Sequence, residues 1–471
     1  MVLAASSSQH IFANGSSISP FFHGASILHL PVELLAMIFT MIQSTRQSLS
    51  AIEELRLPTA FPHSAASVCR HWRSVMLENP RLWTRIAVFV GPSNPTPLSD
   101  LCTWLKASRD LPINVHVMRR PDDMQITPDS GEYERDRVCA VVDILKPHVL
   151  RCTSLSFQLL HRSSLPSLCD DIGALLKVRT LILTCQDGAP SPLDNPLLDE
   201  ANYGWGRRLE PPLEFPELVY LEIDGPNFVK VSSFNFNWLK QQPRNETLSV
   251  KLSHLELSDA EIDWALKVLQ EASCLFLSHM KLEDWVYNAQ RQPAHILLRR
   301  LEVLYVENVD DEFLREVAYD AWMPQLQELG IQGCNARGFA SYLFLPMRAQ
   351  ILRLEGIHDS HQLMWLFMGC WNGEALYLND CLGFDDRLLD EMCNAITSHD
   401  TPGAAGPLFS LDQLEIVSCN NFSIASLKRF THTVRGHRPF PLHLKVVGLP
   451  APTKEDQTWL IDNTHSYIWE S

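Results

Sequence analysis

The feature that most constrains the fold of this chain is a leucine pattern that recurs in its second half. The full pattern is Leu-x-x-Leu-x-Leu-x-x-Cys, with isoleucine accepted at the third apolar position. The copies are Leu326, Leu329, Ile331 and Cys334, then Leu411, Leu414, Ile416 and Cys419, and a shorter one at Leu376, Leu378 and Cys381. Repetition at fixed positions predicts an array of similar units that share one elongated core.

Weaker copies of the pattern lie before and between these copies, and helical patterns alternate with them. The weaker copies centre on residues 155–157, 181–183, 221–223, 255–257, 275–277, 304–306 and 352–354. Ser258-x-x-Glu261 has the form of a helix-capping box and precedes apolar residues at helical spacing. The alternation resembles irregular leucine-rich repeats, which implies an α/β solenoid with a curved parallel sheet and outer helices.

The cysteines of the repeat favour a structural role. No thiolate partner stands three or four residues from Cys334, Cys381 or Cys419, so a metal site is not indicated. We expect these three side chains to stack as a buried ladder under the turns. The 12 cysteines form no Cys-x-x-Cys pair, which fits reduced thiols inside a cell.

The N-terminal region has a different pattern, typical of short amphipathic helices. Proline is accepted in the first turn of a helix, and Leu30-Pro31 stands before an apolar stripe of Leu34, Leu35, Ile38, Met41 and Ile42. After a polar insert at 43–62, a second helix places Val68, Trp72, Val75 and Met76 on one face and ends before Pro80. A unit of about 55 residues cannot bury all of this apolar surface, so a partner or the next domain must cover the rest.

The same residues resemble the F-box motif. Leu30-Pro31-x-Glu33-Leu34-Leu35-x-x-Ile38-Phe39, Val68-Cys69-Arg70-x-Trp72-Arg73 and Pro80-x-Leu82-Trp83 follow its order, with an enlarged first loop. The resemblance implies docking on the Skp-type adaptor of a cullin-RING ubiquitin ligase. The positions that it implies for docking are Leu30, Pro31, Leu34, Ile38, Val68, Cys69, Trp72, Leu82 and Trp83. The alternative is an ordinary helical cap on the solenoid.

We expect four parts along the chain. They are a flexible leader at 1–25, an F-box-like helical module at 26–84, the irregular leucine-rich-repeat solenoid at 85–450, and a C-terminal cap or tail at 451–471. Strands at 85–90 and 113–117, with a helix at 101–105 between them, start the solenoid. Segments rich in proline, glycine or charge predict loops at 118–136, 186–214 and 398–407.

Composition and charge narrow the classes of partner. The net charge of -16 argues against a sequence-independent grip on nucleic-acid phosphates, which needs clustered Lys and Arg. No apolar run approaches the roughly 20 residues that cross a bilayer. The first 25 residues lack the pattern of a secretory signal. We therefore expect an intracellular protein, cytoplasmic or nuclear, with no nucleic-acid and no membrane partner.

The strand pattern also predicts a surface. The residues between the leucines point to the opposite face of each strand, because side chains alternate with a period of two. Those that we expect to bind a target are Tyr220, Glu222, Glu256, Phe276, Tyr305, Glu307, Glu328, Arg353 and Tyr377. Rings among carboxylates predict a surface for a protein with a basic segment. A solvated acidic face explains the same residues without a partner.

No residue pattern indicates catalysis. The chain has no Gly-x-Gly-x-x-Gly, no phosphate loop, no Gly-x-Ser-x-Gly and no His-Glu-x-x-His. We therefore expect no enzyme and no cofactor, but a substrate-recognition adaptor of an SCF-type cullin-RING ligase. The alternative is a leucine-rich-repeat scaffold or binding protein without ligase association, and an enzyme with a dispersed site in the insertions is a third hypothesis.

Overall fold

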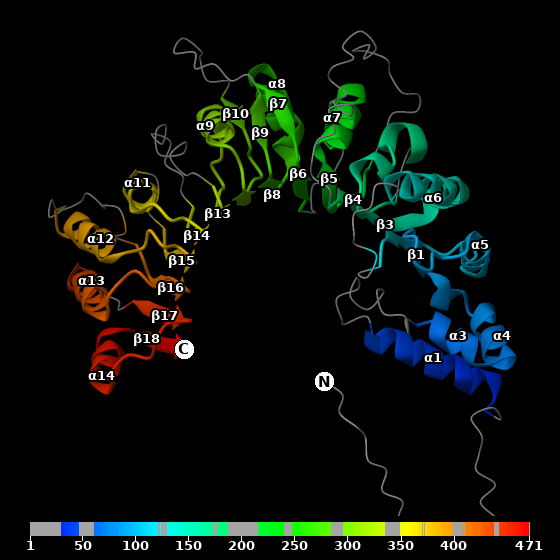
Figure 1. Cartoon of the computed structure of the whole chain (residues 1–471), viewed down its shortest axis with the longest axis horizontal. Helices are drawn as coiled ribbons and strands as arrows, with labels where there is room; N and C mark the ends of the chain where they lie inside the picture. The colour runs from blue at the N-terminus through cyan, green and yellow to red at the C-terminus, as the bar shows by residue number, and fades with distance from the viewer. Residues whose placement is uncertain are drawn as a thin grey trace, which may run out of the picture. The chain divides into compact units, whose positions relative to one another are not determined.

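The protein is represented by a computed structural model that describes residues 30–46, 61–120, 123, 130–172, 177–186, 215–239, 247–283, 295–334, 349–369, 371, 373–398, 408, 410–437 and 442–470. The chain divides into two compact units, Met1–Leu82 and Trp83–Ser471. Figure 1 draws the helices of the first unit in blue and the last strand of the second in red. Within the described ranges, no helix combines the length and apolar character that a bilayer crossing needs.

The first unit is built from short helices. These are α1 (Val32–Arg46), α3 (His63–Val68) and α4 (Arg70–Glu78), and a 3-10 turn, η2 (Pro80–Trp83), follows them. Pro31 precedes α1, and its carbonyl accepts the N–H groups of Leu34 and Leu35 at 3.0 and 3.1 Å. The single second helix expected from the sequence is divided at Cys69. Its extended backbone separates α3 from α4, and its Sγ accepts the N–H of Trp72 at 3.4 Å.

The core of this unit lies between α1 and α4. Leu35 and Phe39 are buried on α1, and Val75 and Met76 are buried on α4. The rings of Phe39 and Trp72 meet edge to face, with centroids 5.2 Å apart. Aromatic pairs of this geometry contribute about 0.5–1.5 kcal/mol beyond the area that they bury. Trp72 therefore helps to hold the two helices together.

The described residues of the second unit form one sheet of fourteen parallel strands, and their order across the sheet is their order along the chain. Its strands are β1 (Arg85–Phe89), β2 (Ile113–Met118), β3 (Cys152–Leu159), β4 (Thr180–Cys185), β5 (Tyr220–Asp224), β6 (Ser249–Ser253), β8 (Cys274–Ser278), β11 (Val303–Glu307), β13 (Glu328–Gln332), β14 (Ile351–Glu355), β15 (Ala375–Asn379), β16 (Gln413–Val417), β17 (His443–Val447) and β18 (Ser466–Glu470). Parallel neighbours need a crossover connection, and helices supply most of these connections.

The helices of the second unit lie along one face of this sheet, as Figure 1 shows. They are α5 (Leu98–Ala107), α6 (Ser130–Leu145), α7 (Gly225–Phe234), α8 (Asp259–Val268), α9 (Asp311–Asp320), α11 (Ser360–Gly369), α12 (Asp386–Ser398), α13 (Ile424–His437) and α14 (Lys454–Asn463). The apolar strand residues, such as Leu414 and Ile416, are buried beneath them. The predicted α/β class with a long parallel sheet and many helices is confirmed.

A recurring turn links each strand from β6 to β17 to the chain that follows it. The residue after each of these strands has a positive φ: His254, His279, Asn308, Gly333, Gly356, Asp380, Ser418 and Gly448. Its N–H donates to the carbonyl of the last residue of the next strand, as Gly333 does to Glu355 at 3.0 Å. This turn directs the chain away from the sheet and adds one more backbone hydrogen bond between neighbouring strands. Glycine adopts such a φ without steric cost.

The repeat cysteines are buried directly after these turns. Cys334, Cys381 and Cys419 are at most 6% exposed. The Sγ of Cys419 accepts the N–H of Cys381 at 3.3 Å, so these two are neighbours. Ile357 follows the turn that lies between Cys334 and Cys381. The predicted ladder is therefore interrupted at one position. The hydrogen bond between Cys419 and Cys381, together with burial, raises the pKa of the Cys419 thiol.

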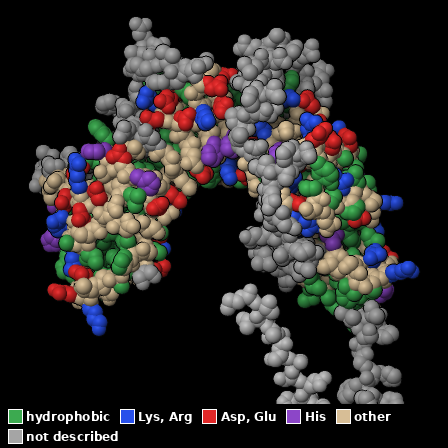
Figure 2. Space-filling view, viewed as in Figure 1, with side chains coloured by type: hydrophobic (Ala, Val, Ile, Leu, Met, Phe, Trp, Pro, Cys, Tyr) green, Lys and Arg blue, Asp and Glu red, His purple; other side chains and the backbone are tan. Residues whose placement is uncertain are grey.

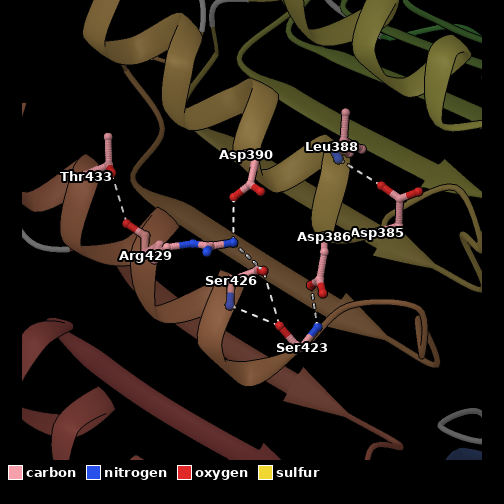
Figure 3. Close-up of polar contacts among 8 residues, drawn as sticks. All are labelled: Asp385, Asp386, Leu388, Asp390, Ser423, Ser426, Arg429 and Thr433. Carbon is pink, nitrogen blue, oxygen red and sulfur yellow. Dashed lines mark hydrogen bonds and ion pairs between the residues drawn. The ribbon is translucent and has the colours of Figure 1, made fainter.

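Neighbouring helices are also joined by polar contacts, most clearly between α12 and α13 (Figure 3). The N–H of Ser423 donates to Asp386 at 2.6 Å, and the Ser423 hydroxyl accepts the N–H of Ser426 at 3.2 Å. Arg429 donates to Asp390 at 2.7 Å and to the Ser426 hydroxyl at 2.9 Å. One serine thus caps the start of α13 and fixes it to α12.

The structure corrects several expectations about the elements. The predicted loop at 118–136 is wrong in its second part, because α6 begins at Ser130. The predicted strand at 255–257 does not enter the long sheet: among the described strands, β7 (Glu256–Ser258) pairs with β9 (Lys281–Glu283), and the long sheet contains β6 instead. A second small pair is β10 (Ile296–Leu297) with β12 (Ala321–Trp322). The leader and most of the other two predicted loops lie outside the described residues.

Candidate docking and binding surfaces

Helix α1 has two apolar faces. One face is internal, since Leu35 and Phe39 are 0% and 1% exposed. The other is on the surface, where Leu34, Met37 and Met41 are 41%, 52% and 60% exposed. Spacings of three, four and seven residues place these three side chains on the same side of a helix. The single stripe expected from the sequence is therefore wrong: it combined residues that face the core with residues that face away from it.

The other predicted docking residues lie at different depths. Pro31 and Val68 are exposed, and Leu30, Ile38, Cys69 and Trp72 are partly buried. Leu82 and Trp83 are only 1% and 4% exposed, so they offer a partner almost no surface. The structure thus corrects the predicted docking role of Leu82 and Trp83, because side chains at that depth stabilise the fold. Three exposed residues that the docking prediction did not include, Val32, Met37 and Met41, add to the apolar surface of α1.

The face of the sheet without helices carries a row of side chains. They come from the third residue of each strand, and the strand register aligns them. From β5 to β17 the row is Glu222, Lys251, Phe276, Tyr305, Gly330, Arg353, Tyr377, Glu415 and Lys445. Parallel strands lie about 4.8 Å apart, which brings neighbouring side chains of the row into contact.

Three rings, a glycine and an arginine form the central part of this row, which we call the aromatic row. Its members are Phe276, Tyr305, Gly330, Arg353 and Tyr377. The Phe276 and Tyr305 rings stack in parallel, with centroids 5.1 Å apart and planes 6° apart. The Tyr305 ring lies over Gly330, because a Cβ added there would be 2.1 Å from Cδ1 of that ring. The guanidinium of Arg353 lies 3.9 Å from the ring centroid of Tyr377.

The carboxylate of Glu328 binds two members of the aromatic row. Glu328 Oε1 accepts the Nε–H of Arg353 at 2.5 Å and also accepts the hydroxyl of Tyr305. Burial and the neighbouring Glu328 raise the pKa of Tyr305 to about 12, so its hydroxyl stays protonated at neutral pH. Glu328 therefore joins a ring from one strand to a cation from another.

The two carboxylates that belong to the row itself, Glu222 and Glu415, are also paired. Glu222 accepts from Lys251 at 2.9 Å and from the Tyr220 hydroxyl at 3.0 Å. Glu415 accepts from Lys445 at 2.8 Å. The expected excess of acid is thus largely balanced on this face. The prediction missed Lys251 and Lys445, although each stands between two apolar strand residues, which is the same local pattern that identified the carboxylates.

Two predicted target-binding residues lie apart from the row. Glu256 is on β7, outside the long sheet, and its carboxylate is 4.0 Å from Lys281. Its placement among the other target-binding residues was wrong. Glu307 is the last residue of β11, and Glu355 is the last residue of β14. Among the described residues, neither carboxylate has a cation within ion-pair distance.

Within the described part of the chain, no group of three or more His, Cys, Asp or Glu side chains could hold a metal ion. The exposed face of α1 and the helix-free face of the sheet differ in their chemistry. The first is an apolar helix face, and the second is a nearly neutral row of rings and ion pairs. Such surfaces bind other macromolecules through buried anchors.

Along the sequence, a small helical unit is followed by a unit built on a long parallel sheet. A family model described as F-box-like matches residues 27–88, the part of the chain that contains α1, α3 and α4. The chain thus carries an F-box-like domain, as the motif predicted. No curated protein matches the chain. Domains of the F-box class bind Skp-type adaptors and are typically adaptors of ubiquitin ligases rather than enzymes.

Proposed function

We propose that this protein is a substrate-recognition adaptor of an SCF-type cullin-RING ubiquitin ligase. The F-box-like domain docks the Skp-type adaptor through α1. The second unit is an irregular leucine-rich-repeat solenoid with a curved sheet, and its helix-free face binds a protein target. Such an adaptor works by position, because it raises the concentration of the target near a recruited ubiquitin-conjugating enzyme.

The observation that carries this proposal is the exposed face of α1. Single apolar side chains on a surface need no partner to explain them. Here Leu34, Met37 and Met41 are all at least 41% exposed on one side of one helix, and Val32 is 41% exposed as well. A continuous apolar helix face in a small domain supports a protein interface. The F-box-like match over the same residues supports a Skp-type adaptor as its occupant.

Co-purification with a Skp-type adaptor tests the docking. The variant Leu34→Asp plus Met37→Asp puts two charges on the exposed face and leaves Leu35 and Phe39 in the core. An interface anchor is worth at least about 2 kcal/mol, so each substitution is expected to weaken binding about thirtyfold or more. Trp72 is unsuitable for this test, because its ring packs against Phe39.

The matched control is Leu150→Asp, which makes the same change at a leucine that is 58% exposed in the second unit. It should bind the adaptor as the wild type does. Equal recovery of the adaptor with wild type and double variant would refute docking through α1 and would favour a leucine-rich-repeat scaffold without ligase association. Equal thermal unfolding of all three proteins excludes misfolding as the cause of a loss.

The target surface that we propose is the aromatic row together with Glu307. Because Glu222, Glu328 and Glu415 are already paired with cations, they offer a basic target little further attraction. The rings of Phe276 and Tyr305 and the Arg353–Tyr377 pair are half-buried anchors that a protein segment can cover at low entropic cost. A basic residue in that segment would meet Glu307 or Glu355 at the ends of their strands.

Loss of specific partners tests this second surface. Proteins recovered with wild type are compared quantitatively with those recovered with Tyr305→Ala plus Arg353→Ala, and with Glu307→Lys. We expect the target to be lost from both variants while the Skp-type adaptor is retained, which serves as the internal control. Recovery of the same proteins with the wild type and with both variants would refute a target-binding surface on this face of the sheet.

A further inference from the structure

Strand β18 lies at one edge of the sheet that the described residues form. Among the described residues, β18 pairs with β17 alone. The carbonyl of Glu470 accepts the N–H of Gly448 at 2.7 Å, so Glu470 directs its polar backbone atoms toward β17. Consecutive strand residues direct these atoms to opposite sides. The N–H and carbonyl groups of Tyr467 and Trp469 therefore face the open edge, where another strand can bind them.

The side chains of β18 do not protect this edge. Strands at an edge are usually blocked by a central charge, a proline or a bulge. β18 has none of these, and its central residue is Ile468, which is 47% exposed. Tyr467 and Trp469 lie on the helix side of the sheet, where the Trp469 indole donates to the carbonyl of Leu449 at 3.2 Å. Among the described residues, the edge is therefore apolar at its centre and unpaired.

The neighbouring helix α14 adds a second apolar contact at the same end. Asp456 and Asn463 of α14 face α13, where they bind Lys428 at 2.5 Å and Arg435 at 2.7 Å. At about 100° per residue, Ile461 lies about 140° from Asp456 and about 160° from Asn463 around the helix. Ile461 thus points away from α13, toward the open side, and it is 60% exposed.

We propose that two copies of this protein associate through β18, edge to edge and antiparallel, around a two-fold axis at Ile468. In that pair Ile468 lies opposite Ile468 of the second copy, Tyr467 lies opposite its Trp469, and Ser466 lies opposite its Glu470. The strand is therefore complementary to itself: no like charges meet, the aromatic Tyr467 faces the aromatic Trp469, and Ile468 faces Ile468. Both α14 helices lie on the same face of the joined sheet, with Ile461 between them.

The chemistry of the pair favours a second copy over an unrelated strand. Tyr467 and Trp469 each supply one donor and one acceptor, so the symmetric pair forms two hydrogen bonds at each of two positions. An isologous contact requires every residue to fit its own symmetry partner. The five residues of β18 meet this condition, and Ile461 repeats it on the helix layer. This inference does not depend on adaptor docking or on a target.

Opposite charges at Ile468 test the pair in the protein of 471 residues. Light scattering coupled to size exclusion, over a concentration series, is expected to show a dimer of the wild type. Ile468→Lys and Ile468→Asp each place like charges opposite one another and should weaken the dimer about tenfold or more. An equimolar mixture of the two variants should restore the dimer, because Lys then faces Asp. Leu150→Lys, at an exposed leucine in the 3-10 helix Lys146–Arg151 of the second unit, is the matched control.

Two results would overturn the proposal. One is a wild type that stays monomeric at every concentration, and the other is a dimer that persists in both Ile468 variants. Since Ile468 is about half exposed, both variants should unfold at the wild-type temperature. Should either unfold early, Ile461→Lys provides a second variant on the helix layer, and an unchanged dimer in that variant would also refute the proposed arrangement.

Discussion

Replacement of Gly330 by alanine would test the packing of the aromatic row directly. Gly330 on β13 stands opposite Tyr305 on β11, and an added Cβ would be 2.1 Å from Cδ1 and 2.2 Å from Cε1 of that ring. Atoms of the ring body cannot move aside as the tip of a flexible chain can. The ring must therefore leave its stack on Phe276 and withdraw its hydroxyl from Glu328.

The expected magnitude follows from two opposed effects. Overpacking costs about 1–3 kcal/mol, part of it the stacking of an aromatic pair, which is worth about 0.5–1.5 kcal/mol. Alanine in a strand gains about 0.5–1 kcal/mol over glycine through lower entropy of the unfolded chain. We therefore expect Gly330→Ala to lower the free energy of unfolding by about 1 kcal/mol. In a Tyr305→Ala background the clash is gone, and the same substitution should stabilise by about 0.5–1 kcal/mol.

A double-mutant cycle measures this difference. Urea unfolding of wild type, Gly330→Ala, Tyr305→Ala and the double variant gives the coupling energy, which we expect to be about 2 kcal/mol. An equal effect of Gly330→Ala in both backgrounds would refute the placement of the Tyr305 ring over the glycine. Tryptophan fluorescence and circular dichroism at low urea serve to show that all four proteins are folded.

Three further predictions concern the rest of the second unit. Burial and, to a smaller extent, Arg85 lower the pKa of His116 to about 4. In the unfolded chain the pKa of His116 is near 6.5, so between pH 6.5 and 4 the unfolded state binds a proton that the folded state does not. The free energy of unfolding should therefore fall by up to about 3 kcal/mol as the pH drops from 6.5 to 4. A pH dependence unchanged by His116→Gln would contradict this. Gly333→Ala should lower the melting temperature more than Gly356→Ala, because only at Gly333 does the new Cβ also meet a side-chain oxygen, at 2.4 Å; equal shifts would contradict it. Iodoacetamide should label the exposed Cys102 in the folded protein and the buried Cys419 only after unfolding. Labelling of Cys419 in the folded protein, detected by mass spectrometry, would contradict its burial.

Local pattern predicted the long sheet wherever the pattern was unambiguous. The copies that contain Cys334, Cys381 and Cys419 correspond to β13, β15 and β16. The copy at 255–257 failed, because Leu255-Glu256-Leu257 has the same alternation as Val250-Lys251-Leu252 a few residues earlier. Only the lateral pairing decides which of the two enters the sheet, and pairing is a long-range property that alternation does not contain.

The surfaces were harder to predict than the fold. Leu34 and Leu35 are adjacent in the sequence and equally apolar, and their separation into an exposed and a buried residue depends on where α4 packs against α1. The charge of the sheet face was misjudged for a related reason. Whether Glu328 is neutralised depends on Arg353 of the next strand, so the strand register was needed before the balance of charge could be assessed.

The recurring positive-φ turns have a consequence for how this surface can change. Each strand is fixed to the next by backbone hydrogen bonds that do not depend on side-chain identity, and the chain between turns is much longer from Asp380 to Ser418 than from Gly333 to Gly356. Length variation is therefore absorbed on the helix side and does not disturb strand alignment. One strand and its turn could therefore be replaced to change the side chain exposed at one position of the sheet face, while the neighbouring strands keep their alignment.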